Sequence, residues 1–142
     1  MYERIISKSI LEAMEDTPAV FLQGARQAGK TTLARDLARS ELGAQFLTLD
    51  DASVLAAARS DPQGFLAGQK GPVVLDEVQR VPDLALALKA AIDRDRTPGR
   101  YLLTGSARLL TLPALSEALV GRMEVLTLWP LSAAMRMWAL AS

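Results

Sequence analysis

Apolar and polar residues follow two spacings along the chain, and these predict short strands separated by helices. Continuous apolar runs predict strands at 19–22, 46–49, 72–75, 101–104 and 123–128. Apolar residues at helical spacing predict helices at 2–15, 30–40, 52–59, 82–93 and 109–119, a short helix from Asp61-Pro62, and a last helical stretch from Pro130. Strands that alternate with helices of about ten residues favour βαβ units. The pattern therefore predicts an α/β fold with a parallel sheet whose two faces are both covered by helices.

The length and the composition are those of one packed domain. The chain has 142 residues, of which 50% are apolar and 23% are charged, and a domain usually has about 100–200 residues. Because Lys plus Arg and Asp plus Glu both number 16, the formal net charge is zero. Binding to nucleic acid or to an acidic membrane normally needs an excess of basic residues. The composition therefore does not indicate a nucleic-acid partner, although a local basic patch stays open.

Several kinds of chemistry are excluded by residue types that the chain lacks. It has no cysteine, histidine or asparagine, which excludes disulfides, zinc sites of the Cys/His type, thiol nucleophiles, Ser-His-Asp hydrolysis and N-glycosylation. The longest uncharged run, residues 125–135, has 11 residues, whereas a helix needs about 20 apolar residues to span a bilayer. The N-terminus has no apolar stretch of signal-peptide length. We therefore expect a cytoplasmic protein with no membrane partner.

The strongest motif follows the first predicted strand. Residues 24–31 read Gly-Ala-Arg-Gln-Ala-Gly-Lys-Thr and match the phosphate-binding P-loop pattern G-x-x-x-x-G-K-[ST]. Gly24 and Gly29 allow a backbone turn in which successive N–H groups point at phosphate oxygens. Lys30, expected to be an exposed loop charge, would contact the β- and γ-phosphates, and the Thr31 hydroxyl can bind Mg²⁺. The helix that begins at Lys30 directs its N-terminal dipole at the same anion. The alternative is a glycine-rich turn without a ligand.

Two carboxylates follow the third predicted strand. The apolar run before Asp76 and Glu77 resembles a Walker B strand, in which the Asp lies in the outer shell of Mg²⁺ and the Glu activates water. Consecutive strand residues point to opposite faces, so the two carboxylates are expected to serve different roles, one directed at the metal and one at water. Alternatively, Asp76 only ends a strand and Glu77 is solvated.

Hydroxyl side chains end the fourth predicted strand. Thr104 and Ser106 lie two residues apart and are expected on the same side by the period of a strand. Ligands of open parallel sheets bind beyond the carboxyl ends of the strands. Either hydroxyl could therefore face the γ-phosphate, in the sensor position that holds Asn in many AAA+ ATPases. The alternative is a hydroxyl that ends the strand or caps a helix.

Five blocks carry a resemblance to a known family: residues 24–32, 49–51, 75–80, 103–106 and 119–122. Together they resemble the AAA-type ATP-binding proteins of bacteria and archaea, which join an N-terminal ATPase domain to a C-terminal domain of unassigned function. The resemblance implies the P-loop NTPase fold, a parallel five-stranded sheet of order 5-1-4-3-2, binding of ATP and Mg²⁺, and hydrolysis through Glu77. Those proteins continue well beyond the block at 128–132. We therefore expect residues 1–142 to be a single ATPase domain, truncated before the second domain.

The motifs and the resemblance together assign roles to individual residues. Catalytic roles fall to Glu77, Lys30 and Arg122, and metal binding falls to Thr31 and Asp76. Nucleotide binding is implied for Gly24, Ala25, Arg26, Gln27, Ala28, Gly29, Lys30, Thr31, Thr32, Thr104 and Ser106.

The arginines each allow a second interpretation. Arg122 is a candidate sensor or finger that would neutralise charge on the leaving phosphoryl group, or a cation at a helix C-terminus. Arg26 and Arg80 contact phosphate or a partner, or else form surface ion pairs. We expect residues 50–51 to be an N-cap pair for the helix that follows, and the arginines of 94–100 to belong to a solvated loop.

The sequence thus predicts an ATPase, with two alternatives left open. One is a P-loop small-molecule kinase whose lid is the arginine-rich segment 93–100; the other is an interaction module gated by nucleotide that hardly turns over. A GTPase is excluded because its base-reading motif needs Asn. The apolar residues 125–135 and Trp138 are expected to lose their usual cover, so the chain should associate with itself or with an unknown protein partner.

Overall fold

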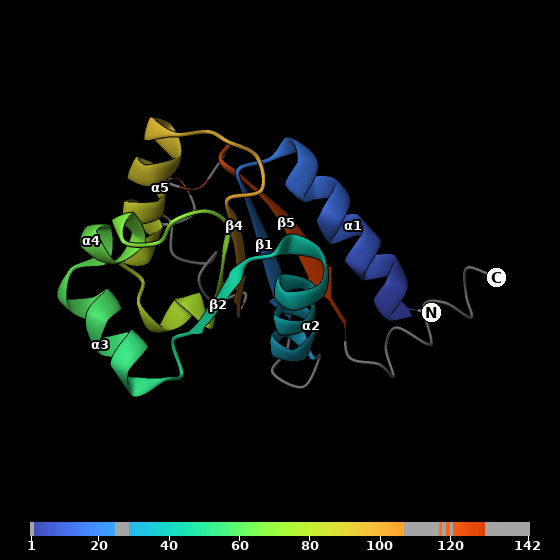
Figure 1. The fold of residues 1–142 in the computed structure, drawn as a ribbon, viewed down its shortest axis with the longest axis horizontal. Coiled ribbons are helices and arrows are strands. Elements are labelled where there is room, and N and C mark those ends of the chain that lie inside the picture. Colours follow the sequence, from blue (N-terminus) through green and yellow to red (C-terminus); the bar gives the residue numbers. More distant parts are fainter. Residues whose placement is uncertain (1, 25–28, 107–116, 118, 120, 130–142) are drawn as a thin grey trace.

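A parallel sheet of five strands lies at the centre of the structure (Figure 1). The computed structural model describes residues 2–24, 29–106, 117, 119 and 121–129. The strands are β1 (Ala19–Gly24), β2 (Gln45–Thr48), β3 (Val73–Asp76), β4 (Tyr101–Gly105) and β5 (Met123–Leu128). They pair in the order β2-β3-β4-β1-β5. Read from the other edge, this is the predicted order 5-1-4-3-2, so the expected α/β P-loop NTPase fold is confirmed.

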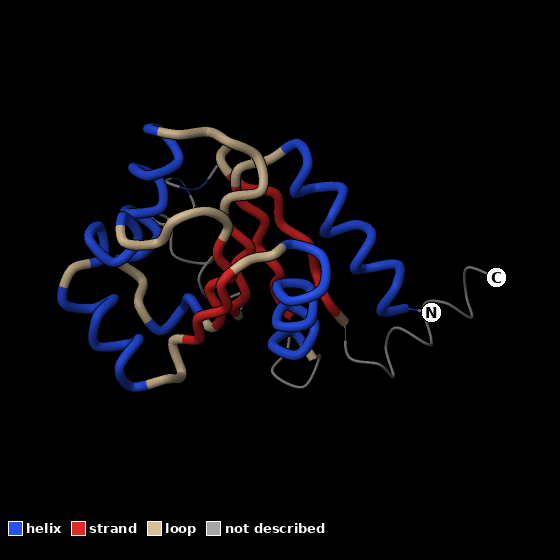
Figure 2. Tube along the Cα trace, viewed as in Figure 1, coloured by secondary structure: helices blue, strands red, loops and turns tan. Residues whose placement is uncertain are grey.

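Helices cover both faces of this sheet (Figure 2). They are α1 (Tyr2–Asp16), α2 (Lys30–Leu37) with its π-helical continuation η2 (Ala38–Leu42), α3 (Ala52–Ser60), α4 (Pro62–Ala67), the 3-10 turn η3 (Val78–Arg80) and α5 (Leu84–Arg94). Helices α1 and α2 lie on one side of the sheet, and α3, α4 and α5 lie on the other (Figure 1). Apart from Glu117 and Leu119, the predicted helix at 109–119 lies outside the described residues, as does the stretch from Pro130.

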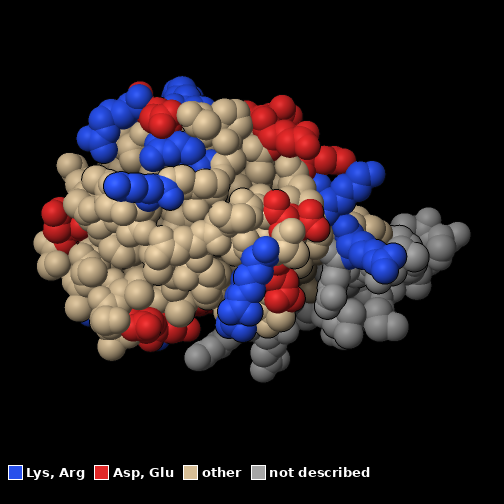
Figure 3. Space-filling model, viewed as in Figure 1, with Lys and Arg blue, Asp and Glu red and all other residues tan. Residues whose placement is uncertain are grey.

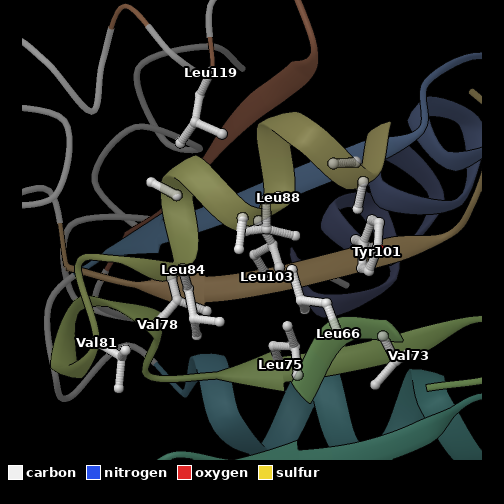
Figure 4. Close-up of a cluster of buried hydrophobic side chains, with 14 of the residues drawn as sticks. Leu66, Val73, Leu75, Val78, Val81, Leu84, Leu88, Tyr101, Leu103 and Leu119 are labelled. Atoms are coloured by element: carbon white, nitrogen blue, oxygen red, sulfur yellow. The ribbon is translucent and has the colours of Figure 1, made fainter. Parts of the chain in front are cut away.

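The hydrophobic core has two parts because successive residues of each strand face opposite sides of the sheet. In β1, Phe21 packs among residues of α3, α4 and α5, and Figure 4 shows this cluster gathered around α5 and β4. Its neighbour Leu22 packs with α1 and α2. Both side chains are fully buried, and each such burial contributes about 1.5–3 kcal/mol. A sheet covered on both faces requires continuous apolar strands, which explains the apolar runs of the sequence.

The chain order of this fold brings four strand ends together at one edge. Gly24 ends β1, Thr48 ends β2, Asp76 ends β3 and Gly105 ends β4, and all four strands run in the same direction. The register sets Thr48 directly beside Asp76. This carboxyl edge is the place where open α/β sheets bind their ligands.

Candidate functional site

The start of α2 carries the features of an anion-binding helix end. Gly29 is the N-cap, with φ 85° and ψ 21°, and no side chain caps the helix. This left-handed conformation favours glycine. No acidic side chain lies in the first turn, so the N–H groups and the dipole of the helix are available to a phosphate. Thr32 is exposed in the same turn, and the predicted loop residues 25–28, which include Arg26, lie outside the described part of the chain.

Lys30 is buried, and the expectation that it is an exposed loop charge is wrong. Its side chain is 4% exposed. The ammonium group folds back across the loop and donates a 2.9 Å hydrogen bond from Nζ to the carbonyl oxygen of Gly24. This contact holds the cation at the end of β1, beside the open end of α2. Since an ammonium has three donors, the bond to Gly24 leaves the others for an anion.

Asp76 is the centre of a buried cluster of hydroxyl groups. Its side chain is fully buried. Oδ1 accepts hydrogen bonds from Thr31 Oγ1 at 2.9 Å and from Thr104 Oγ1 at 2.6 Å, and Oδ2 accepts from Thr48 Oγ1 at 2.7 Å. A buried carboxylate needs such partners because burial removes its water. The cluster therefore ties α2, β2 and β4 to the end of β3.

The donor set at Thr31 and Asp76 fits Mg²⁺. Because the Thr31 hydroxyl gives its hydrogen to Asp76, the lone pairs of its oxygen remain for a cation. Hydroxyl and carboxylate oxygens are the hard ligands that Mg²⁺ prefers, usually beside phosphate oxygens and water. Within the described ranges, no three or more Asp or Glu residues form a cluster that could hold a metal unaided. Such a site would therefore be completed by a ligand.

The backbone at Glu77 is no longer in the extended conformation of β3. Its backbone has φ 63° and ψ 46°, the only positive φ of a non-glycine residue in the part of the chain that the structure describes. Strand alternation therefore does not apply at this position, although the two carboxylates do lie in different surroundings. The Glu77 amide donates to Thr104 Oγ1 at 3.1 Å, and its carboxylate Oε2 accepts from Gln79 Nε2 at 2.6 Å. Strained backbone of this kind is often found at functional sites.

The two candidate sensor hydroxyls have different surroundings. Thr104 is fully buried, donates to Asp76 and accepts from the Glu77 amide. Both of these hydrogen bonds of the Thr104 hydroxyl are therefore made to other residues of the site. Ser106 Oγ is buried and has no hydrogen-bond partner among the described residues, while its amide donates to Gln79 Oε1 at 3.2 Å. Of the two, Ser106 has the hydroxyl that a ligand could use.

Two site residues, Thr48 and Gln79, have no counterpart among the sequence-based predictions. Thr48 donates to Asp76, and Gln79 donates to Glu77. The sequence position of Thr48 could have indicated this role, because its hydroxyl lies at the end of β2 and that of Thr104 lies near the end of β4. It becomes informative only when β2 is known to pair with β3.

The structure does not bring Arg122 to this edge within one chain. Arg122 precedes β5, and its neighbour Met123 is level with Ala19, whereas Leu128 is level with Gly24. Five steps of about 3.3 Å make roughly 16 Å along the strand. At the opposite, amino edge, Arg122 Nε and Nη2 donate to Asp93 Oδ1 and Oδ2 at 2.8 and 3.0 Å. Its role as a finger stays a prediction that only a neighbouring copy could satisfy.

The Arg122–Asp93 pair also affects how both groups titrate. The hydrogen bonds from Arg122, followed by its charge, lower the pKa of Asp93, and donating these bonds to Asp93 raises the pKa of Arg122. Arg80, in contrast, lies at the carboxyl edge, where its Nε is 2.6 Å from Asp50 Oδ1. Of the two interpretations of Arg80, the structure therefore shows the surface ion pair.

Asp51 and Arg100 make contacts that hold local elements of the fold. Asp51 is the N-cap of α3 and accepts from the Ser53 amide at 2.9 Å, which confirms half of the expected capping pair. This contact, after the bond from the Ser53 hydroxyl, lowers the pKa of Asp51. Arg100 donates to the carbonyl oxygens of Ala91 and Asp95.

The arginine-rich segment 93–100 precedes β4, so it lies at the amino edge of the sheet. A kinase lid would have to cover the carboxyl edge, and this position disfavours the kinase alternative. Figure 3 shows blue and red side chains interspersed over the visible face. That distribution gives no single-sign field on this face of the kind that binds nucleic acid. No helix in the described part of the chain is both long and apolar enough to cross a bilayer.

Comparisons with known proteins identify the family of the chain. The chain is 40% identical over 134 residues to uncharacterized protein Mb2031c of Mycobacterium bovis and to uncharacterized protein Rv2008c of Mycobacterium tuberculosis. These matches cover 89% of this chain but 30% of each relative. The Walker-type ATPase PABY2304 of Pyrococcus abyssi is similar in structure with a TM-score of 0.49 and 16% identity, over 87% of this chain and 52% of that one. Residues 16–136 match the sequence profile of the AAA domain family, and the chain therefore belongs to this family of nucleotide-binding ATPase domains.

Proposed function

We propose that the chain is a cytoplasmic ATPase that binds ATP with Mg²⁺ and hydrolyses it to ADP and phosphate. The observation that carries the proposal is the meeting of Lys30, Asp76 and Glu77 at one edge of the sheet. Lys30 lies on the Gly24 carbonyl, and the Thr31–Asp76 hydrogen bond joins α2 to β3. Glu77 directly follows Asp76. These contacts support a site in which a cation, a candidate pair of metal-binding oxygens and a candidate base share one edge of the sheet.

Binding of the phosphates falls to the loop and to the first turn of α2. The N–H groups at the start of α2 and the Lys30 ammonium would contact phosphate oxygens. Thr31 would hold Mg²⁺ directly, with Asp76 orienting the hydroxyl from behind through their 2.9 Å bond. When bound, the metal neutralises charge on the phosphate oxygens.

Hydrolysis then needs a base, and we assign Glu77 to this role. Its Oε2 is engaged by Gln79, so Oε1 is the oxygen that would accept a proton from water. The water oxygen forms a bond to the γ-phosphorus, the bond from the γ-phosphorus to the bridging oxygen breaks, and ADP leaves with the electron pair. The proton on Glu77 later returns to solvent.

The substitution Glu77→Gln tests this assignment. We expect it to lower phosphate release by about 10²–10⁴, the usual contribution of a positioned base, and to leave the dissociation constant of ATP in the presence of Mg²⁺ within about twofold. Glu12→Gln on the exposed face of α1 is the matched control and should change neither quantity. A Glu77→Gln variant that turns over like the wild type would remove Glu77 as the base.

We also infer that the chain associates with itself or with a protein partner. Support comes from the edge strand β5 and the residue after it, where Val125 is 38% and Trp129 is 46% exposed. Residues 130–135 and Trp138, the rest of the predicted apolar stretch, lie outside the described residues. Light scattering and phosphate release, measured together over a range of protein concentrations, test this. A monomer whose rate per chain is independent of concentration would contradict it.

A further inference from the structure

Gln79 joins the candidate base to the end of the neighbouring strand. Its amide nitrogen donates to Glu77 Oε2 at 2.6 Å, and its amide oxygen accepts from the backbone N–H of Ser106 at 3.2 Å. One side chain therefore connects the carboxylate of Glu77 with the first residue after β4. The contact with Glu77 spans two positions of the sequence, whereas the contact with Ser106 spans 27 positions.

The backbone around Gln79 is built to allow this bridge. A Cβ at Gly105 would lie 2.8 Å from Gln79 Oε1, 3.2 Å from Phe21 Cζ and 3.3 Å from Val78 Cγ2. Only glycine lets the amide lie against β4 at this position, because a Cβ would meet rigid core atoms as well as the amide. Within η3, Val78 is buried in the core, and this anchors the turn that carries Gln79.

Glu77 is thus held by β4 at two separate points. Its backbone N–H donates to Thr104 Oγ1, and its carboxylate is held through Gln79 by the amide of Ser106. A displacement of the end of β4 would move both points. Within the part of the chain that the structure describes, the buried Ser106 hydroxyl has no hydrogen-bond partner.

The chemistry of this position requires an amide. Gln79 donates to a carboxylate and accepts from an N–H group at the same time, and an amide side chain carries the donor and the acceptor that this needs on two separate atoms. Glutamate would keep the acceptor but would repel Glu77. Methionine has a similar length and can do neither, beyond weak acceptance by its sulfur.

We propose that Gln79 is a positioning residue that orients the Glu77 carboxylate according to the position of Ser106 at the end of β4. This rests on the proposed function, since the orientation matters only if Glu77 activates water. A carboxylate released from Gln79 would spend less time in the geometry that accepts the proton, and small misplacements of such groups lower rates strongly.

The test is a cycle of Gln79→Met and Glu77→Gln, with Gln63→Met on exposed α4 as the control. We expect Gln79→Met to lower kcat about tenfold, with ATP affinity and thermal stability close to those of the wild type. In the Glu77→Gln background the same change should have no further effect, because Gln79 acts through Glu77. A tenfold loss in both backgrounds, or a loss of ATP affinity, would overturn the proposal in favour of a structural role.

The Ser106 amide gives a second readout that needs no turnover. In nucleotide-free protein, Gln79→Met should increase hydrogen exchange at this amide, whereas Gln79→Glu should keep it protected and still lower kcat. Unchanged exchange in Gln79→Met would show that the bridge does not form. A wild type that releases no phosphate would overturn the proposed function itself, while wild-type turnover with an unaffected Gln79→Met would overturn only the role of Gln79.

Discussion

The hydroxyl of Thr31 donates a 2.9 Å hydrogen bond to Asp76 Oδ1 and so joins the first turn of α2 to the end of β3, across 45 positions of the sequence. Thr104 reaches the same oxygen, and Thr48 reaches the other. Because Asp76 is fully buried, these three hydroxyls replace its water. Asp76, which is expected to orient a metal ligand, therefore also links α2, β2 and β4 to the end of β3.

Asp76→Asn should weaken both the fold and nucleotide binding. The new amide keeps one acceptor oxygen but turns an NH₂ group toward hydroxyls that need an acceptor. Leaving buried groups unsatisfied costs about 1–3 kcal/mol of the free energy of unfolding, measured by chemical denaturation. Binding of ATP should become weaker and less dependent on Mg²⁺. The control is Asp50→Asn, since the exposed Asp50–Arg80 pair contributes at most about 1 kcal/mol. Equal stability of the two variants would contradict the structural role of Asp76 in linking these elements.

Lys30→Met should weaken nucleotide binding strongly without unfolding the chain. Methionine keeps much of the buried apolar stem and loses the ammonium that lies on the Gly24 carbonyl. A charged hydrogen bond contributes about 1.5–3 kcal/mol, so ATP affinity should fall about 10–100-fold by calorimetry. Lys8→Met on the exposed face of α1 should bind as the wild type does. Unchanged affinity in a folded Lys30→Met variant would remove the P-loop assignment.

The sequence predicted the P-loop residues of this site and missed Thr48, which depends on register. Gly24, Gly29, Lys30 and Thr31 lie within one eight-residue motif whose spacing fixes their geometry. Thr48 gains its role only because β2 pairs with β3, which sets it level with Asp76. The strand order itself came from the resemblance to a family, since spacing alone gives alternation but not adjacency.

Two further features could not be predicted because they depend on side-chain and backbone conformation. Burial of Lys30 follows from its side chain folding back onto β1, and the motif fixes its position but not that rotamer. The left-handed backbone of Glu77 occurs in a segment without the Gly or Asn that usually marks such a conformation. In this conformation Glu77 makes its contacts with Thr104 and Gln79, which are not visible in the sequence.

Glu77→Gly should separate stability from activity. At φ 63° a side chain costs about 1–2 kcal/mol relative to glycine, while glycine adds about 0.5–1 kcal/mol of chain entropy to the unfolded state. We therefore expect a free energy of unfolding equal to that of the wild type or up to about 1.5 kcal/mol higher, with hydrolysis lost. Glu12→Gly, inside helix α1, should lose about 1 kcal/mol. If both variants lost the same stability, Glu77 would not be strained.

Arg122→Met should lower stability in a way that depends on pH. The hydrogen bonds from Arg122 hold the pKa of Asp93 below its ordinary value in the folded chain. A carboxyl group with a lowered folded pKa stabilises the fold above its unfolded pKa, which is about 3.9, and loses this contribution as the pH falls through the folded pKa. The wild type should therefore melt at a higher temperature than Arg122→Met at pH 7. The difference should shrink below about pH 4, as Asp93 gains a proton in both proteins.

The same variant tests where Arg122 acts, and the exposed Arg59→Met on α3 controls for loss of charge. Since Arg122 lies at the amino edge, next to Met123, which is about 16 Å along β5 from the level of Gly24, phosphate release by dilute Arg122→Met should equal that of the wild type. If Arg122 reaches the site of a neighbouring copy, its loss should appear only at concentrations where the wild type associates, because an arginine supplied in trans requires contact between chains. A reduced rate in the dilute variant would contradict the placement of Arg122 away from its own site. A melting difference that persisted unchanged from pH 7 to pH 3 would contradict its pairing with Asp93.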